Sequence, residues 1–275
     1  MGDQVRHPLT TVSHIPTEIT QGGPNAQSSR ASTPVRPRRL DSPAAPRPLP
    51  RTVAVPEVIP RERNEQLSRA FNFIVAVLAL TLALPLLILL AFCVKLTSRG
   101  PILYAQTRVG LDRRWRSTLA LHERRLEDFG GQVFTIYKFR TMRVDAERGS
   151  GAVWAKENDP RVTWLGKYMR ILRLDEIPQF WNVLLGDMNV VGPRPERPSI
   201  VSRLREDIPE YQSRHRVKPG ITGLAQINQQ YDACMDDVKS KVNWDITYIR
   251  EQGLWMDIMI LLRTVPAVLL KYRGW

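Results

Sequence analysis

The chain of 275 residues is long enough for one sizeable domain with an appendage. Its two cysteines, Cys93 in an apolar run and Cys234 in a polar region, form neither a metal-ligand spacing nor a disulfide framework, so redox chemistry is not expected. The formal net charge of +13 indicates an anionic partner, and charge alone does not distinguish among nucleic acid, a phospholipid surface and a phosphorylated substrate.

Residues 1–63 are rich in proline, serine, threonine, glutamine and arginine and lack a periodic apolar pattern. This composition is typical of a disordered Pro/Arg-rich extension. The first 30 residues contain no apolar stretch, so we do not expect a cleaved secretory leader. The arginines of the extension suggest a contact with anionic lipid, because each basic residue near such a surface contributes about 1 kcal/mol.

Residues 71–94 form an apolar run that is uninterrupted by charge and long enough to cross a hydrocarbon core of about 30 Å. Pro85 lies near its middle, where it removes a helix hydrogen bond and favours a kink. Basic residues flank both ends, and the positive-inside rule places both flanks in the cytoplasm, which a bent, re-entrant helix satisfies. We therefore expect a membrane helix over residues 64–98, with the re-entrant form favoured and the spanning form as the alternative.

Residues 101–110 and 131–142 are rich in β-branched and aromatic side chains, which predicts a pair of strands forming a short β-hairpin. The linking residues 111–130 are dense in charge and longer than a hairpin needs, so a small surface helix is expected there. The predicted fold class is α+β: a helix-rich domain over residues 99–275 on one N-terminal membrane helix. Helical periodicity occurs at 163–173, 178–185, 197–216, 235–251 and 254–270.

The last of these helical segments, residues 254–270, is apolar on most faces but carries Asp257 and Arg263. A helix that lies in the membrane interface and a buried core helix both fit this pattern. We expect Asp257, like Asp245 in the preceding segment, to be a cap or an anchor and not a catalytic group.

An adjacent acidic pair, Asp175 and Glu176, lies just before Pro178. Proline favours the first turn of a helix, so the pair is predicted at a helix start, where acids often only satisfy free amides and the helix dipole. Arg170 precedes the pair, and Arg194 follows it in a rigid GPRPE turn. Because guanidinium groups bind phosphate oxygens bidentately and a carboxylate can hold Mg²⁺ shared with a diphosphate, this cluster predicts phosphoryl transfer.

The sequence also carries four motifs in a fixed order: RVG (108–110), IYKFRTMRVDAE (136–147), NDPRVTWLGKYMRILRLDEIPQFWNVLLGDMNVVGPRPE (158–196) and RVKPGITGLAQIN (216–228). These motifs closely resemble the bacterial sugar transferases, also called monotopic polyprenyl-phosphate sugar phosphotransferases or phosphoglycosyl transferases. The resemblance extends from about residue 65 to the C-terminus. With one apolar block, the chain resembles the minimal form of this family, since larger relatives carry several spanning helices ahead of the catalytic domain.

The resemblance implies an enzyme that transfers sugar 1-phosphate from a UDP-sugar to undecaprenyl phosphate, releases UMP and begins a surface glycan such as an exopolysaccharide. It implies Mg²⁺ as the cofactor, and an inner-membrane location with the catalytic domain facing the cytoplasm. The nucleophilic aspartate of the family corresponds to Asp175, which would form a covalent phosphosugar intermediate and contact the metal. Glu176 would assist metal or proton handling.

Four basic residues are candidates for phosphate or nucleotide binding. By their positions in the motifs, Arg170 and Arg194 match family arginines that hold phosphates or the nucleotide. Lys138 is a further candidate, although a lysine on a strand beside an aromatic residue is often only solvated. Arg214 is another, because it lies near the 218–223 loop that resembles the family's nucleotide segment, whose glycines could equally serve only the turn.

Two other functions are alternatives to an enzyme. A nucleic-acid-binding protein would fit the positive charge, but no zinc spacing, RNP motif or basic zipper accompanies it, so nucleic acid is not an expected partner. A non-catalytic membrane scaffold that keeps the family fold is the alternative function, and the intact acidic pair and arginines argue against it. The expected partners are a UDP-sugar, undecaprenyl phosphate and membrane lipid. A homodimer is left open, and so is the sugar, with glucose or galactose ahead of an N-acetylated amino sugar.

Overall fold

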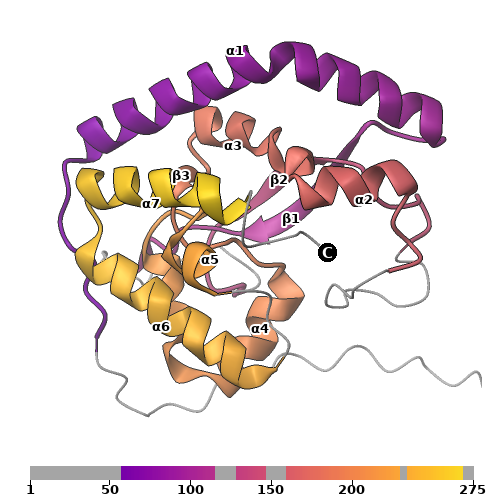
Figure 1. The fold of residues 1–275 in the computed structure, drawn as a ribbon. Helices are drawn as coiled ribbons and strands as arrows, with labels where there is room; N and C mark the ends of the chain where they lie inside the picture. The colour runs from indigo at the N-terminus through magenta and orange to yellow at the C-terminus, as the bar shows by residue number, and fades with distance from the viewer. Residues whose placement is uncertain (1–56, 115–127, 147–158, 230–233, 269–275) are drawn as a thin grey trace, which may run out of the picture. The chain divides into compact units, whose positions relative to one another are not determined.

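The computed structural model describes residues 57–114, 128–146, 159–229 and 234–268. Most of the segment expected to form a surface helix, and nearly all of the predicted extension, lie outside these residues. The predicted α+β class is confirmed, since helices predominate and the strands are few and short (Figure 1).

Residues 57–63 belong to the folded domain. Val58 is buried. The Arg61 N–H donates to the carbonyl oxygen of Ile249 at 3.0 Å, and the Arg61 carbonyl accepts a hydrogen bond from Gln252 at 2.9 Å. The predicted end of the extension is therefore too late by at least these residues, because backbone hydrogen bonds to a distant helix leave no periodic signal in the sequence.

The predicted membrane helix is α1 (Glu65–Thr97), whose 33 residues match the expected 64–98. Asn64 caps it by accepting a hydrogen bond from the Leu67 N–H at 2.9 Å. Among the described helices, α1 alone is long and apolar enough to cross a membrane, judged by length and composition, and 11% of its most apolar stretch is buried. This low burial distinguishes α1 from a core helix. The helix continues through Pro85 and follows an arched path over the domain (Figure 1).

The N-terminal half of α1 is bonded to the domain beneath it. The Arg69 guanidinium donates to the carbonyl oxygens of Val183 and Leu184, near the end of α3 (Gln179–Leu185), at 2.6 and 2.5 Å. Asn72 is buried and accepts a hydrogen bond from the Val190 N–H at 2.6 Å. A buried amide on an apolar helix is costly unless it is paired, so these bonds fix the register of α1 on the domain.

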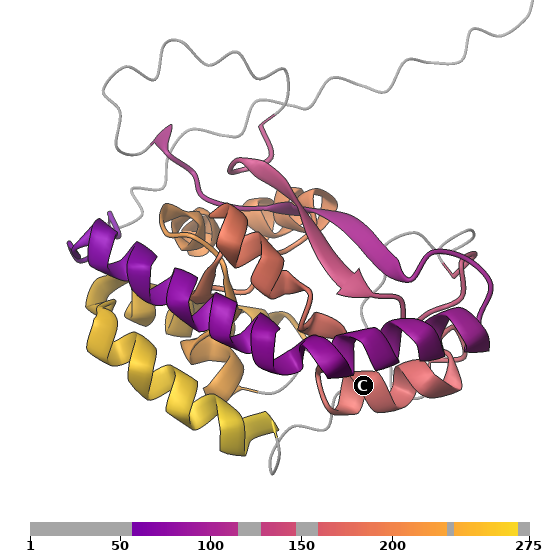
Figure 2. The ribbon, with the colours of Figure 1, turned by 90° about the horizontal axis from the view of Figure 1, so that it is seen from above.

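The C-terminal end of α1 is bonded to the same domain. Arg140 donates to the carbonyl and hydroxyl oxygens of Ser98, the C-cap residue, at 2.7 and 2.6 Å. Leu90 and Val94 pack against Phe139 in one apolar cluster. Both ends of α1 therefore contact one domain, and in the view from above α7 (Leu254–Pro266) lies beside its first half and α2 (Trp164–Ile171) beside its second half (Figure 2).

The predicted β-hairpin is present. β1 (Leu103–Val109) pairs antiparallel with β2 (Val133–Phe139), and Tyr104 lies directly opposite Lys138. Because side chains alternate along a strand, Tyr104, Gln106 and Arg108 share one face of β1. That face is turned toward the cavity described below.

A second, smaller sheet was not predicted. β3 (Asn189–Val191) pairs parallel with β4 (Gly220–Thr222), and strands of three residues are too short to show a period of two. Gly192 and Gly220 allow these backbones to approach, since a Cβ on Gly220 would lie 2.1 Å from the Gly192 nitrogen. Gly220, in the 218–223 loop, thus allows close packing of the two backbones.

The predicted helices are present, with differences of extent. The helix predicted over 254–270 is α7, which ends at Pro266, and residues 269–270 lie outside the described residues. The helix predicted over 163–173 ends at Ile171, because Arg173 adopts a left-handed backbone conformation. The helix predicted over 197–216 is divided at Pro209, which has no N–H to continue it. The short α5 was not predicted. The remaining elements are α2 (Trp164–Ile171), η3 (Leu174–Glu176), α4 (Pro198–Asp207), η4 (Pro209–Arg216), α5 (Leu224–Asn228), α6 (Met235–Glu251) and α7 (Leu254–Pro266).

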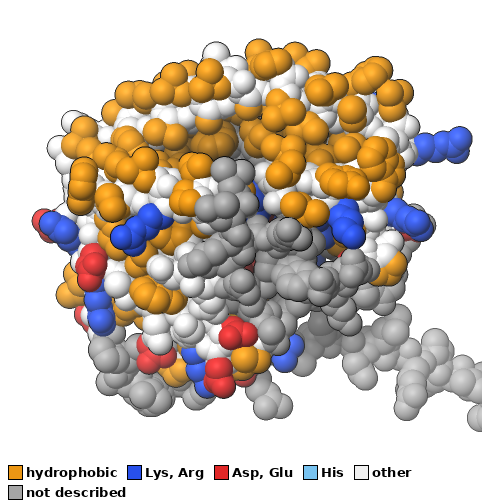
Figure 3. All heavy atoms as spheres, viewed as in Figure 1, with side chains coloured by type: hydrophobic (Ala, Val, Ile, Leu, Met, Phe, Trp, Pro, Cys, Tyr) orange, Lys and Arg blue, Asp and Glu red, His pale blue; other side chains and the backbone are white. Residues whose placement is uncertain are grey.

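The helix α7 has a buried face and an exposed apolar face, and this pattern fits both arrangements that its sequence leaves open. Its inner face is in the core, where Ile260 is buried and Asp257 accepts a hydrogen bond from the Tyr248 hydroxyl at 2.8 Å. Its outer face is apolar and exposed. Hydrophobic side chains gather on the upper part of the molecule, over α1 and α7 (Figure 3). The exposed residues of α7 include Trp255, Leu262 and Val265.

Candidate active site

All six predicted site residues outside α1 line one cavity of about 650 Å³. Its described lining includes eleven arginine and lysine side chains against three acidic ones, so its electrostatic character favours an anionic ligand. Pro85 of α1 is not part of this lining. The six residues are Lys138, Arg170, Asp175, Glu176, Arg194 and Arg214.

Asp175 and Glu176 lie in η3, a short 3₁₀ helix that comes just before α3 in the chain. Arg173 precedes this turn with φ 57° and is the only non-glycine residue with positive φ in the part of the chain that the structure describes. Such a conformation costs about 1–2 kcal/mol, and strain of this kind clusters at functional sites. Pro178 is the N-cap of α3, so Asp175 and Glu176 precede the helix that they were predicted to begin.

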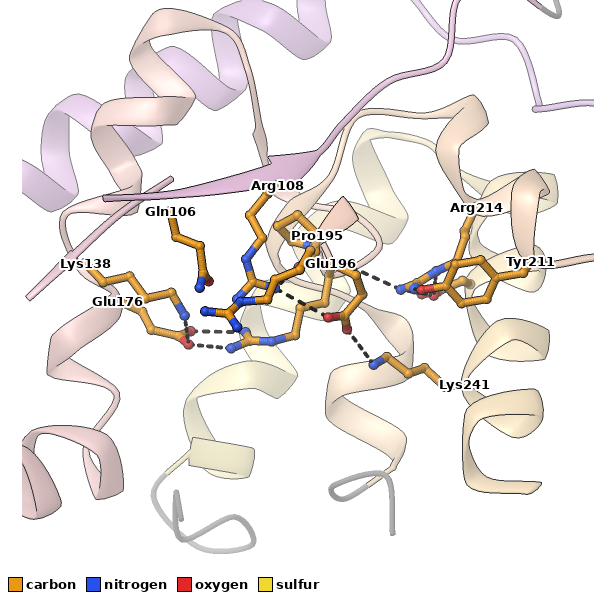
Figure 4. Close-up of polar contacts among 12 residues, drawn as sticks. Gln106, Arg108, Lys138, Glu176, Pro195, Glu196, Tyr211, Arg214 and Lys241 are labelled. Atoms are coloured by element: carbon orange, nitrogen blue, oxygen red, sulfur yellow. Dashed lines mark hydrogen bonds and ion pairs between the residues drawn. The ribbon is translucent and has the colours of Figure 1, made fainter. Parts of the chain in front are cut away.

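The Glu176 carboxylate is held by three cations. Lys138 Nζ lies 3.0 Å from Oε1, and Arg194 donates to both oxygens at 2.5 and 3.2 Å (Figure 4). Arg173 Nη1 lies 3.8 Å from Oε1 of Glu176. Burial by itself would raise the pKa of Glu176, but Arg194 and Lys138 outweigh it and hold the pKa well below its usual value. Glu176 is therefore ionised and fixes the positions of its cations.

The Asp175 carboxylate is buried but makes no hydrogen bond or ion pair with any residue that the structure describes. Burial, followed by the charge of Glu176, raises its pKa to about 6, against the opposing effect of Lys138 and Arg170. Two neighbouring acids whose pKa values are driven apart mark different chemical roles. Asp175 is the acid whose oxygens are available to a ligand in the cavity.

Arg170 offers an unused donor at the same cavity. Its Nη1 is buried and has no hydrogen-bond partner among the described residues. A buried guanidinium nitrogen without an acceptor is costly, so an anion that supplies an oxygen there would be bound favourably. This geometry fits the predicted phosphate-binding role of Arg170.

Arg214 lines the cavity but directs its guanidinium into the core. It pairs with the buried Asp245 at 2.8 Å, donates to the Tyr211 hydroxyl at 2.7 Å, and donates to the carbonyl oxygen of Arg194 at 3.1 Å. Its donors are thus directed at protein acceptors and not at a phosphate. The structure makes Arg214 a residue that positions the turn carrying Arg194, and Asp245 its structural partner.

Three site residues were not singled out from the sequence. The Glu196 carboxylate lies 3.1 Å from Lys241 Nζ through Oε1 and 3.4 Å from Arg108 Nη1 through Oε2 (Figure 4). The same Arg108 nitrogen donates to the Pro195 carbonyl oxygen at 2.9 Å. Burial would raise the pKa of Glu196, but Lys241 and Arg108 outweigh it and lower the pKa to about 2. Arg108 and Glu196 lie inside the family motifs and could have been identified there, whereas Lys241 lies in none of them.

The described side chains provide only some of the ligands that a magnesium ion needs. No group of three or more metal-binding side chains occurs within the described ranges. Mg²⁺ is usually held by one or two carboxylates together with substrate phosphates and water, and Asp175 is a free oxygen donor of the right kind. Glu176 is already occupied by its cations, so Asp175 is the residue that would hold the ion.

The raised pKa of Asp175 predicts that its charge destabilises the fold near neutral pH. The folded protein binds this proton more tightly than the unfolded chain, whose pKa is near 3.8, so the penalty grows as pH rises to about 6 and vanishes below about pH 4. Asp175→Asn should therefore raise the free energy of unfolding at pH 7.5 by roughly 1–3 kcal/mol. Thermal unfolding in detergent at pH 7.5 and pH 4 measures this. An equal effect at both pH values would contradict the explanation.

The chain was compared with known protein families and proteins. Residues 63–271 match the family model described as "Bacterial sugar transferase". An undecaprenyl-phosphate N-acetylgalactosaminephosphotransferase of Aeromonas hydrophila is 40% identical over 203 residues, 74% of this chain and 44% of the relative. A UDP-glucose:undecaprenyl-phosphate glucose-1-phosphate transferase of Escherichia coli K12 is 40% identical over 204 residues, which are 74% of this chain and 40% of the relative.

A third relative is covered over most of its length. A UDP-glucose:undecaprenyl-phosphate glucose-1-phosphate transferase of Caulobacter vibrioides is 38% identical over 213 residues, which are 77% of this chain and 73% of the relative. The chain spans less than half the length of the Aeromonas and Escherichia proteins. The family match covers the membrane helix, the hairpin and the whole cavity. The chain belongs to the bacterial sugar transferase family.

Proposed function

We infer that this protein transfers sugar 1-phosphate from a UDP-sugar to undecaprenyl phosphate, releases UMP, and thereby performs the first membrane step of exopolysaccharide or other surface glycan synthesis. One observation carries the proposal: the buried Asp175 carboxylate, which makes no hydrogen bond or ion pair with the described residues, lies beside a Glu176 held by three cations, in a cavity lined with arginine and lysine. The names of the relatives support the proposal, since two of them name glucose-1-phosphate transfer between UDP-glucose and undecaprenyl phosphate and one names N-acetylgalactosamine phosphate transfer.

In the first half-reaction, an Asp175 oxygen attacks the phosphorus that carries the sugar. An oxygen–phosphorus bond forms to Asp175 while the bond from that phosphorus to the bridging oxygen breaks, and the electron pair leaves with UMP. The carboxylate must be ionised, and a pKa of about 6 leaves it mostly ionised at neutral pH. Because it makes no hydrogen bond with the described residues, none of their donors reduces its nucleophilicity.

In the second half-reaction, an oxygen of undecaprenyl phosphate attacks the same phosphorus. The bond to Asp175 breaks, the carboxylate is regenerated, and the sugar phosphate is left on the lipid as a diphosphate. Neither step needs a net proton. Lys138 and Arg194, held by Glu176, lie where negative charge accumulates in both steps, and Arg170 supplies its unused donor. Mg²⁺ held by Asp175 and the substrate phosphates would add further charge neutralisation.

The membrane arrangement that fits this function is a re-entrant α1 with the catalytic domain on the cytoplasmic side of the inner membrane. A helix of 33 residues is about 50 Å long. A straight span would carry one end across the bilayer, whereas Arg69 near one end and Ser98 at the other both bond to the catalytic domain. The exposed apolar faces of α1 and α7 support contact with lipid.

Cysteine labelling tests this topology. Single cysteines at Glu62 and Arg99, both exposed, would be introduced in a background in which Cys93 and Cys234 are replaced. We expect neither position to react with a membrane-impermeant maleimide in intact spheroplasts, and both to react after permeabilisation. A spanning helix would leave one of the two reactive in intact spheroplasts, which would contradict the re-entrant proposal.

The reaction itself is tested by UMP release from a panel of UDP-sugars. The detergent-purified full chain would be assayed with Mg²⁺, with and without undecaprenyl phosphate, beside an active relative. We expect lipid-dependent UMP formation with at least one sugar, and its loss on chelation of the metal. Folded protein that releases no UMP across the panel would overturn the proposal and favour the scaffold function.

A further inference from the structure

A part of the cavity wall next to the reacting centre has hydrogen-bonding groups that the mechanism does not use. On β1, Gln106 Nε2 donates to the Tyr104 hydroxyl at 2.9 Å, and Arg197 donates to the same hydroxyl at 3.2 Å. All three side chains line the cavity. Tyr104 and Gln106 lie on the hairpin face that also carries Lys138, and Arg197, the N-cap residue of α4, reaches the Tyr104 hydroxyl from outside the hairpin.

These contacts leave one donor and one acceptor unused. A tyrosine hydroxyl has one hydrogen to donate besides the oxygen that accepts bonds, and the Tyr104 oxygen already accepts from Gln106 and Arg197. Its hydrogen has no acceptor among the described residues, and neither does Gln106 Oε1 have a donor there. The orientation of the Gln106 amide follows from its bond to Tyr104. Tyr104 is 39% exposed, so a ligand in the cavity can reach this donor and acceptor.

The distance of Tyr104 and Gln106 from the acidic residues indicates which part of the substrate they would contact. Tyr104 lies directly opposite Lys138 in the hairpin, and Lys138 lies 3.0 Å from Glu176, the neighbour of Asp175. The phosphorus attacked by Asp175 carries the sugar directly, while the uridine is one phosphate further away. Figure 4 shows Gln106 extending from β1 toward the Glu176 and Lys138 pair.

We propose that Tyr104 and Gln106 form the subsite that binds hydroxyl groups of the donor sugar and thereby determine which UDP-sugar is used. This proposal rests on the proposed function of the cavity. Each sugar hydroxyl both donates and accepts, so two neighbouring hydroxyls of a hexose match the adjacent donor of Tyr104 and acceptor of Gln106. Arg197 is a positioning residue that holds the Tyr104 hydroxyl.

The subsite would discriminate by the direction of the sugar hydroxyls. Two hexoses that differ in one hydroxyl leave the protein groups paired in one case and unpaired in the other. Relatives about equally similar to this chain are named for glucose and for N-acetylgalactosamine, so overall identity does not select the sugar. A few residues beside the sugar are therefore expected to decide it.

Equilibrium binding to the full chain in detergent tests the subsite without requiring turnover. Dissociation constants for UDP-glucose, UDP-galactose, UDP-N-acetylgalactosamine and UMP would be measured on Tyr104→Phe and Gln106→Ala in an Asp175→Asn background. We expect each variant to bind the preferred UDP-sugar about tenfold more weakly, to lose preference among the sugars, and to bind UMP unchanged. Thr107→Val, on the opposite face of β1 and exposed, is the matched control and should change none of these values.

The other outcomes overturn the proposal in distinguishable ways. A parallel loss for UMP and all UDP-sugars would assign the subsite to the uridine, and unchanged binding would show that Tyr104 and Gln106 contact no part of the donor. Because the readout is binding, a chain that discriminates sugars but releases no UMP would retain the subsite while the transfer reaction fails. Circular dichroism of both variants controls for folding, which we expect to be unchanged because the side chains lie at the cavity wall.

Discussion

Asp175→Asn is expected to lower lipid-dependent UMP release at least about 10⁴-fold, because it removes the atom that forms the covalent bond to the sugar phosphate. The amide cannot attack phosphorus, and the surrounding cations cannot replace a nucleophile. Intact-protein mass spectrometry provides a second measurement. Wild-type protein incubated with UDP-sugar in the absence of lipid should gain the mass of one sugar phosphate, and the variant should gain none.

The control for this variant is Asp207→Asn, an acid-to-amide change at an exposed position of α4. It should leave both UMP release and the adduct unchanged. Membrane association of Asp175→Asn should also be unaffected, since α1 and the outer face of α7 do not depend on it. Retention of wild-type turnover by Asp175→Asn would show that another group is the nucleophile.

Glu176→Gln is expected to reduce turnover about 10²–10³-fold, a loss of the size seen when one element of electrostatic stabilisation is removed. A neutral amide cannot hold Lys138 and Arg194 together, and their like charges then repel each other. We also expect the free energy of unfolding to fall by about 2–3 kcal/mol, less than for a fully buried pair because both cations keep some contact with solvent.

The pH dependence separates this role of Glu176 from direct participation in the reaction. Burial lowers the pKa of Lys138, and Glu176 raises it. Without Glu176 the pKa of Lys138 should fall further, so Glu176→Gln should lose activity at a lower alkaline pH than the wild type. Glu206→Gln, at an exposed position, is the control. If the wild type and Glu176→Gln lost activity at the same alkaline pH, the result would contradict the proposal that Glu176 acts by holding Lys138.

The site residues were predictable to the extent that they lie in motifs. Asp175 and the arginines before and after it could be identified because the GPRPE turn and the acidic pair are short, local patterns. The division of labour within the pair could not, because it depends on Lys138 and Arg194, which lie 38 and 18 residues from Glu176 in sequence. Arg214 was assigned to the ligand, but its partner Asp245 is 31 residues away, and packing turned it inward.

The elements whose signals are local could be predicted from the amino-acid pattern alone. The long apolar run located α1 almost to the residue, and β-branched and aromatic residues identified the hairpin. Three features depend on tertiary contacts: which side chains meet in the cavity, how residues 57–63 pack, and where the three-residue strands pair. The physical reason is that helix and strand periodicity are set by neighbouring residues, whereas ion pairs and short strands are selected by contacts between distant segments.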